Sequence, residues 1–373
     1  MFSLDGQVER RGTRCAKWDK FGKDLLPMWV ADMDFPAPPA VLKALRERVE
    51  HGVFGYGLDD DMPGIICGWI RSEFRVGVEE DWIVLLPAIV PALRAACNLT
   101  EGPVMINVPN YNNLLDAPLK AGKKAIRSPL KNQDEKYEID FADMQKRVSG
   151  DLRLLFLCNP HNPVGRVYTN DELLELSRFA RKNNLIVISD EVHCGLVFDR
   201  PHIPWFTVDD YAAEQGITLI GPAKTYNLPG LPLGFAVIPN KDLRAEFRKT
   251  CYAMPAPGVF SVIAAKAAFG ESREWKNALL EYLRQNRDYL EKRLRTAFPA
   301  ARLPHVEGTY LQWVDFRPLG IEHPYQWLQD HPKILAVDGK VYGCEGYIRL
   351  NFGTRRSLLE EALDRIEECV KAR

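Results

Sequence analysis

Three polar side chains lie immediately beyond runs of apolar residues. Lys224 follows the run "ITLIG" in "ITLIGPAKTYNLPG", Asp190 ends the stretch "LIVISD", and Asn162 lies between prolines in "LCNPHNPVG". In sheets of parallel strands, ligands bind outside the carboxyl ends of the strands. We therefore expect this amine, carboxylate and amide to meet at one edge of a sheet.

A lysine, a carboxylate and an amide at such an edge are the set that pyridoxal phosphate requires. The Lys224 amine can hold the cofactor aldehyde as an imine and, once a substrate amine displaces it, act as a base at the α-carbon. Asp190 can pair with the protonated ring nitrogen and keep the ring electron-withdrawing, and Asn162 can donate to the phenolate oxygen. Each residue alone is more typical of a surface lysine, a structural carboxylate or a turn.

The elements that must position these residues are short apolar runs separated by helical patterns. Runs this continuous, without polar alternation, predict strands buried on both faces by crossover helices, and hence an α/β fold. The clearest crossover is "TNDELLELSRFARKNN", where Thr169 and Glu172 have capping-box spacing. It joins a strand ending near Leu157 to one ending near Asp190. The runs are "WIVLLP", "VMINVP", "LRLLFLCNP", "LIVISDE", "ITLIG" and "GFAVIP".

The pattern changes near residue 280, at the long charged helical region "NALLEYLRQNRDYLEKRLRTAF". Short strands and one last helix follow, in which Ser357 and Glu360 have capping-box spacing. We predict a large cofactor-binding domain over residues 41–280 and a small C-terminal domain over 281–373, with residues 1–40 packing on the small domain. No internal repeat or low-complexity linker separates these parts.

Composition excludes several classes of partner. The 49 basic and 50 acidic residues are interspersed, which argues against nucleic acid and membrane surfaces. The eight cysteines include no C-x-x-C pair and fit neither a disulfide framework nor a zinc site. The first residues lack a secretory apolar core, and no run approaches about 18 apolar residues. We expect a cytoplasmic protein that acts on small molecules and binds no metal.

Several stretches resemble the MalY/PatB family of cystathionine β-lyases and related C–S lyases, within the fold-type I pyridoxal-phosphate enzymes of the aminotransferase class I/II superfamily. Those before residue 60 separate this family from generic aminotransferases. The resemblance implies a large domain with a mostly parallel seven-stranded sheet and a smaller α+β domain built from both chain ends. The stretches are "KWDKFGKDLLPMWVADMDFPAP", "HGVFGYG", "LCNPHNPVGRVYTNDEL", "ISDEVHCGLVFD", "PAKTYNLPGL", "EGTYLQWVDF" and "YGCEGYIRLNFGTRRSLLEEAL".

Matched positions give the cofactor-binding residues that the resemblance implies. Lys224 resembles the Schiff-base lysine, Asp190 the partner of the ring nitrogen and Asn162 the phenolate donor. Tyr111, in "VPNYNNL", resembles the aromatic residue stacked on the ring, and His193 falls where related enzymes place a tyrosine near the phenolate. Without the family pattern, Tyr111 would be a core or hairpin tyrosine and His193 a packing histidine.

The resemblance also implies the groups that bind the substrate and the cofactor phosphate. Arg349, in "YIRLNF", matches the arginine that binds the substrate α-carboxylate, which suits its planar guanidinium. Backbone N–H groups at a helix N-terminus, at Ala88 and Ile89 in "LLPAIVP", would hold the phosphate. Tyr56, in "FGYG", matches a residue that reaches the phosphate of the neighbouring subunit, which implies a homodimer. Alone, Arg349 would be a surface strand residue and "GYG" a turn.

The chain departs from the family pattern at several positions. Ala88 stands where glycine is common, Ala223 where serine is usual before the lysine, and Val164 where the loop usually has threonine or serine; "NYNNL" replaces a Tyr-x-Pro-Phe pattern. None of these changes removes a group that makes or breaks a bond. We expect activity to remain, with effects on cofactor affinity and substrate preference.

Three functions are compatible with these motifs. The leading hypothesis is β-elimination of a sulfur-containing amino acid to a thiol, pyruvate and ammonia. Transamination by a pyridoxal-phosphate aminotransferase uses the same core residues, and these motifs do not separate the two reactions or identify the natural substrate. A regulatory binding protein on this fold is the third, and retention of Lys224, Asp190, Asn162 and Arg349 argues against it.

Overall fold

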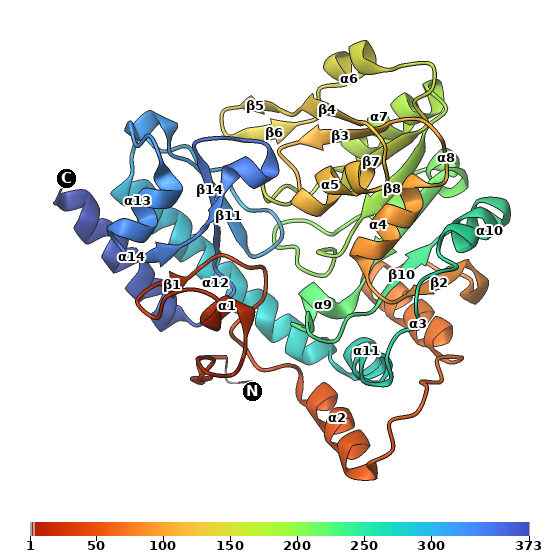
Figure 1. Ribbon diagram of the computed structural model, residues 1–373, viewed down its shortest axis with the longest axis horizontal. Helices are drawn as coiled ribbons and strands as arrows, with labels where there is room; N and C mark the ends of the chain where they lie inside the picture. Colours follow the sequence, from red (N-terminus) through yellow and green to blue (C-terminus); the bar gives the residue numbers. More distant parts are fainter. Residues whose placement is uncertain (1, 3, 373) are drawn as a thin grey trace.

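The computed structural model describes residue 2 and residues 4–372 and is built around a seven-stranded sheet (Figure 1). The pairs from β9 through to β4 are parallel, and β10 runs antiparallel to both of its neighbours. The predicted α/β class and mostly parallel seven-stranded sheet are confirmed. The strand order is β2 (Ile83–Leu86), β10 (Gly234–Val237), β9 (Gly216–Ile220), β8 (Ile186–Asp190), β7 (Leu154–Cys158), β3 (Val104–Val108) and β4 (Ala125–Pro129).

Each of the predicted apolar runs matches one of these strands to within a few residues, because helices cover both faces of the sheet. Along β7, Leu154 and Phe156 belong to one apolar cluster, and Leu155 and Leu157 belong to another on the opposite face. The edge strand β4 was not among the predicted runs. Its sequence "AIRSP" is mostly exposed or half-buried, so it lacks the continuous apolar pattern of the inner strands.

The helices of this part divide between the two faces of the sheet. One apolar cluster includes side chains of α4 (Ile89–Cys97), α5 (Asn112–Lys120) and α10 (Lys241–Thr250). The other includes side chains of α6 (Phe141–Arg147), α7 (Asn170–Lys182) and α8 (Asp210–Glu214). The remaining elements here are α2 (Pro39–His51), α3 (Met62–Phe74), η1 (Glu80–Trp82), β5 (Lys131–Gln133), β6 (Lys136–Glu138), η2 (Trp205–Thr207), α9 (Pro222–Thr225) and α11 (Val259–Glu271).

One of the two predicted capping boxes is present. Thr169 and Glu172 form a reciprocal box at the start of α7, the crossover between the parallel neighbours β7 and β8. The box predicted at Ser357 is wrong, because α14 (Arg356–Lys371) has Arg355 as its N-cap residue, two residues earlier, and has no side-chain cap. The Tyr282 hydroxyl instead accepts a hydrogen bond from the Arg356 backbone N–H at 2.6 Å and satisfies the start of this helix.

The C-terminal part packs a small sheet against helices and is joined by the N-terminal segment (Figure 1). We propose that residues 1–40 form one domain with this part, because β1 (Leu26–Pro27) pairs with β12 (Ile334–Leu335) and the Met28 carbonyl accepts from Asn351 N–H. The other elements are α1 (Ala16–Asp19), α12 (Arg273–Ala297), β11 (Leu311–Asp315), η3 (Arg317–Leu319), α13 (Pro324–Asp330), β13 (Val337–Asp338), η4 (Gly339–Tyr342) and β14 (Tyr347–Asn351).

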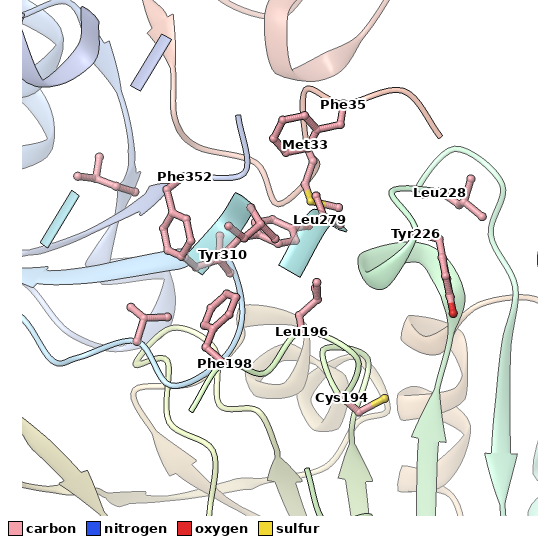
Figure 2. Close-up of a cluster of buried hydrophobic side chains, with 14 of the residues drawn as sticks. Met33, Phe35, Cys194, Leu196, Phe198, Tyr226, Leu228, Leu279, Tyr310 and Phe352 are labelled. Atoms are coloured by element: carbon pink, nitrogen blue, oxygen red, sulfur yellow. The ribbon is translucent and has the colours of Figure 1, made fainter. Parts of the chain in front are cut away.

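The segment before α2 is anchored by the largest apolar cluster. Met33 and Phe35 lie in this cluster with Leu279 of α12 and Tyr310, as Figure 2 shows. Burial of such side chains contributes about 1.5–3 kcal/mol each. The cluster therefore fixes the neighbouring residues 29–32, which form part of the cavity described below. No helix among residues 4–372 is long and apolar enough to span a bilayer.

Candidate active site

A cavity of about 480 Å³ lies at the carboxyl ends of the central strands. Cys158 and Asp190 end β7 and β8, Gly221 follows β9, and all three line the cavity. Its wall contains every site residue predicted from the sequence except Tyr56. Those residues are Ala88, Ile89, Tyr111, Asn162, Asp190, His193, Lys224 and Arg349.

Lys224 lies on the short helix α9, directly after β9. Its Nζ donates to the Ala31 carbonyl at 2.6 Å. Burial, reinforced by the Arg349 charge, lowers the pKa of Lys224 to about 8, although Asp32 and Asp190 act in the opposite direction. A larger fraction of this amine is therefore neutral near pH 7 than for an ordinary lysine, and a neutral amine is a nucleophile and a base.

The side chain of Asp190 is buried at the end of β8, and among the described residues its carboxylate accepts one hydrogen bond, from Val192 N–H to Oδ1 at 3.3 Å. No cationic side chain within the described residues forms a salt bridge with it. Burial raises the pKa of Asp190 to about 7, more than the Val192 N–H and Lys224 lower it. This carboxylate is buried without a cationic partner. A ligand that brings a protonated or cationic group beside it would therefore be stabilised.

Arg349 and Asn162 are joined by a hydrogen bond across the cavity wall. Arg349, in β14, donates from Nη1 to Asn162 Oδ1 at 3.1 Å and from Nη2 to the Trp29 carbonyl at 2.8 Å. Its guanidinium lies 5.0 Å from the ring centre of Tyr342. The Arg349 Nε is buried and has no partner among the described residues. The arrangement leaves a guanidinium donor for a carboxylate and leaves the Asn162 amide nitrogen to donate to a ligand.

Tyr111 and His193 provide two rings to the cavity. Tyr111 precedes α5, and its hydroxyl accepts from Asn113 Nδ2 at 2.6 Å. The His193 ring contacts Tyr310 edge-on, with centroids 5.9 Å apart, and its buried Nδ1 has no partner in the described part of the chain. Burial first, and then the charges of Lys224 and Arg349, hold the pKa of His193 well below its usual range. A neutral imidazole therefore faces the cavity.

The start of α4 offers backbone donors. Ala88, in extended conformation, precedes α4, and Ala88, Ile89 and Val90 line the cavity. The first N–H groups of a helix have no partner within the helix, so they can bind an anion. At position 221, between β9 and α9, only glycine fits without a shift of the backbone. A Cβ on residue Gly221 would lie 2.8 Å from the Leu233 carbonyl oxygen.

Tyr56 is the exception among the predicted residues. It does not line this cavity, and its side chain is fully exposed. The neighbouring Val53, Phe54 and Leu58 are also exposed. This segment therefore presents apolar side chains and a tyrosine to the exterior of a single chain.

Two backbone groups that hold the lysine and the arginine were not predicted from the sequence. The Ala31 and Trp29 carbonyls accept from Lys224 and Arg349, and Trp29 also lines the cavity. Asn351 Nδ2 fixes this segment by donating to the Val30 and Asp32 carbonyls at 2.6 and 2.7 Å. The stretch "MWVAD" belongs to the family-like residues, but nothing in it signals a role for carbonyl oxygens.

Only some of the residues that depart from the family pattern line the cavity. Ala88 and Ala223 line the cavity. Val164, expected near the cofactor, is not among the lining residues and is instead fully buried in an apolar cluster with Trp313 and Tyr342. A hydroxyl at this position would need a buried hydrogen-bond partner, so valine suits the cluster.

Three features of the cavity fit the binding of pyridoxal phosphate. It contains a lysine with a lowered pKa, a buried carboxylate without a cationic partner and buried nitrogens of His193 and Arg349 that lack acceptors. Backbone donors for a phosphate lie at the start of α4. Among residues 4–372, no cluster of His, Cys, Asp and Glu could hold a metal ion.

Known proteins match this chain over nearly its whole length. The family model "Aminotransferase class I and II" matches residues 87–366. Cystathionine beta-lyase PatB of Bacillus subtilis (strain 168) is 34% identical over 385 aligned residues, which cover 99% of this chain and 100% of that protein.

Solved structures match over the same extent. The crystal structure of OvoB superposes with a TM-score of 0.96 at 35% identity and covers 100% of both chains. Cystalysin from Treponema denticola, whose crystal structure contains a pyridoxal 5'-phosphate cofactor, gives a TM-score of 0.94 at 28% identity and covers 100% of this chain and 99% of that one.

Proposed function

The chain belongs to the aminotransferase class I and II family, and within it to the MalY/PatB-like C–S lyases of pyridoxal-phosphate fold type I, and we propose that it cleaves a cysteine thioether by β-elimination. The products would be a thiol, pyruvate and ammonia. The observation that carries this proposal is the meeting of Lys224, Asp190, Asn162 and Arg349 in one cavity.

Three side chains and the start of α4 would hold the cofactor and the substrate. Lys224 would bind pyridoxal phosphate covalently, Asp190 would pair with its ring nitrogen, and the start of α4 would bind its phosphate. Arg349 would bind the substrate carboxylate through its guanidinium. When bound, the cofactor supplies an electron-withdrawing ring that stabilises negative charge at the substrate α-carbon.

The chain's own contribution to the bond-breaking step would be to move one proton. Lys224 Nζ, once freed by the substrate amine, would take the proton from the substrate α-carbon. The C–S bond breaks, its electron pair leaves on sulfur, and the thiolate takes up a proton. Lys224 would then displace the product enamine from the cofactor, and water would hydrolyse that enamine to pyruvate and ammonium, so the reaction needs no oxidant or reductant.

The pH dependence of cofactor binding follows from Lys224. We expect the rate at which the apoprotein takes up pyridoxal phosphate to rise with pH and to flatten above a midpoint near pH 8. Only the neutral amine attacks an aldehyde, and the pKa of Lys224 is lowered from 10.5 to about 8. Stopped-flow absorbance measures this rate. A rate that still rises steeply at about pH 10 would show an ordinary lysine and contradict the assignment.

Arg349→Lys is expected to raise KM for the amino-acid substrate about 50-fold, with a smaller effect on kcat, because lysine cannot make the paired contacts of a guanidinium. Steady-state pyruvate release measures both constants. Arg302→Lys, at an exposed arginine, is the matched control and should leave both unchanged. A loss confined to kcat would assign Arg349 a role other than carboxylate binding.

We propose that the protein is a homodimer in which Tyr56 reaches the phosphate in the neighbouring subunit. The exposure of Tyr56, Val53, Phe54 and Leu58 supports this proposal. Tyr56→Phe is expected to weaken pyridoxal-phosphate affinity about ten-fold by removing one hydrogen bond to a charged group. Equilibrium dialysis and analytical ultracentrifugation are the measurements, with Tyr325→Phe as control. A monomer, or unchanged affinity in the Tyr56 variant, would exclude this role.

One experiment separates β-elimination from the other functions. The cofactor-loaded protein is incubated with a panel of cysteine thioethers, including cystathionine, with and without an added keto acid. Pyruvate and thiol without the keto acid are the expected result. Amino transfer that requires the keto acid would instead indicate an aminotransferase, and no reaction in either condition would indicate a binding protein.

A further inference from the structure

One backbone segment near the N-terminus, residues 29–35, holds both Lys224 and Arg349, and we call it the strap. Its Ala31 carbonyl accepts from Lys224 Nζ at 2.6 Å, and its Trp29 carbonyl accepts from Arg349 Nη2 at 2.8 Å. Trp29 and Ala31 also line the active-site cavity. The position of the strap therefore decides where the amine and the guanidinium lie.

Asn227 holds the strap with both polar atoms of its side-chain amide. Its Oδ1 accepts from Met33 N–H at 2.9 Å, and its Nδ2 donates to the Met33 carbonyl at 2.9 Å and to the Phe35 carbonyl at 2.8 Å. Both N–H donors and the acceptor oxygen of the amide are thus used on the backbone of the strap. A side chain with fewer polar atoms could not make these three hydrogen bonds together.

Asn227 belongs to the same turn of the chain as Lys224. Its φ of 55° is left-handed, a conformation that asparagine adopts more readily than most residues. The Leu228 N–H donates to the Ala223 carbonyl at 2.9 Å, which closes the turn around Lys224 in the manner of a Schellman motif. The amide that holds the strap and the amine proposed to bind the cofactor therefore belong to one closed turn.

Asn351 holds the strap from the side of Arg349. It lies two residues after Arg349 at the end of β14, and its Nδ2 donates to the carbonyls of Val30 and Asp32, which flank Ala31. The strap is thus held at two places, by one asparagine near the lysine and one near the arginine. Resting on the proposed function, we propose that Asn227 is a positioning residue that keeps the strap against the Lys224 amine and so sets the reactivity of this amine toward the cofactor aldehyde.

Release of the strap would change the surroundings of the Lys224 amine. Burial is the largest effect on its pKa, and Arg349 on β14 also lowers it, whereas Asp32 in the strap and Asp190 at the end of β8 raise it. His193, the other titratable group of the cavity wall near the amine, is held neutral by burial. If the strap moves away, water reaches the amine and the largest effect weakens, so the pKa of Lys224 rises toward that of an ordinary lysine.

Asn227→Gly tests this role, because glycine keeps the left-handed turn and removes the amide. We expect the pH midpoint of pyridoxal-phosphate uptake by the apoprotein to rise by about one pH unit, and the uptake rate at pH 7 to fall about ten-fold, as the smaller neutral fraction of the amine requires. Stopped-flow absorbance measures both. Asn184→Gly is the matched control, since Asn184 is exposed and has a φ of 52°, and it should leave the midpoint unchanged.

Hydrogen–deuterium exchange of the apoprotein provides a readout without the cofactor. Peptides spanning residues 29–35 should exchange faster in Asn227→Gly than in the parent protein or in Asn184→Gly, because the Met33 N–H loses its acceptor. Analytical ultracentrifugation ensures that the proteins are compared in the same oligomeric state, so that charges contributed by a neighbouring subunit are constant. Asn227→Ser, which has one polar atom in place of two, is measured in the same way and replaces the glycine variant if that variant does not fold.

The outcomes separate this proposal from the proposed function. A folded Asn227 variant with an unchanged midpoint and unchanged exchange, even with a lower melting temperature, would show that the apolar contacts of Met33 and Phe35 alone hold the strap, and would overturn the positioning role. Failure of the parent protein to take up pyridoxal phosphate through Lys224 would instead overturn the proposed function.

Discussion

Replacing Lys224 with alanine is expected to lower pyruvate release by about 10³-fold or more, because the variant loses the group proposed to remove the α-proton. It should also lose the visible absorbance that a lysine-bound pyridoxal phosphate gives. The proposed reaction needs a neutral amine at this position, and burial lowers the pKa of Lys224 to about 8. Steady-state kinetics and an absorbance spectrum of the cofactor-loaded variant measure the two effects.

The variant should keep the native fold. The Lys224 amine donates to the Ala31 carbonyl, and the Tyr310 hydroxyl donates to the same carbonyl at 2.9 Å. Loss of the amine therefore leaves this carbonyl with a hydrogen-bond donor. Circular dichroism and the melting temperature of the apoprotein test this point. Lys241→Ala, at an exposed lysine, is the matched control and should retain both spectrum and turnover. An unchanged visible spectrum in the Lys224 variant would refute the assignment.

Asp190→Asn is expected to lower kcat by about 10²–10³-fold while leaving the covalent bond of the cofactor to Lys224 intact. Asparagine has nearly the same size and keeps an oxygen for Val192 N–H, but it cannot hold a positive charge on a ring nitrogen. The raised pKa of Asp190 in the free protein results from burial without a cation, and a cationic ring would remove that cause.

The spectrum and the kinetics of this variant separate its possible effects. The absorbance of the bound cofactor should persist, and KM should change little. Asp210→Asn, at an exposed aspartate, controls for the loss of one negative charge. Activity within about two-fold of the parent protein would mean that Asp190 does not support the ring, against the proposed electrostatic role.

The sheet could be predicted from the sequence because its inner strands are covered on both faces. Each inner strand is then a continuous apolar run, and Asp190 and Lys224 follow such runs. The same argument fails at the edge strand β4, where one side is exposed and the run is broken by Arg127 and Ser128. The start of α14 was misplaced because a tertiary contact, from Tyr282, satisfies its first N–H instead of a local side chain.

The site was predictable where side chains carry it and not where the backbone does. Lys224, Asp190, Asn162 and Arg349 lie in motifs, and the structure brings them together. The carbonyl of Ala31 lies 193 residues from Lys224 along the chain, and its role depends on folding rather than on residue type. The hydrogen bonds of Asn227 to the strap likewise join distant segments, which is why the motif around Lys224 alone did not indicate them.

The central claim is that Lys224 is the residue that binds the cofactor covalently. Borohydride reduction of the purified protein loaded with pyridoxal phosphate, followed by digestion and mass spectrometry, tests it directly because reduction makes the lysine–cofactor bond permanent. We expect one modified peptide, "TLIGPAKTYNLPG" or a fragment containing its lysine. Modification at another lysine, or at many exposed lysines without Lys224, would contradict the account.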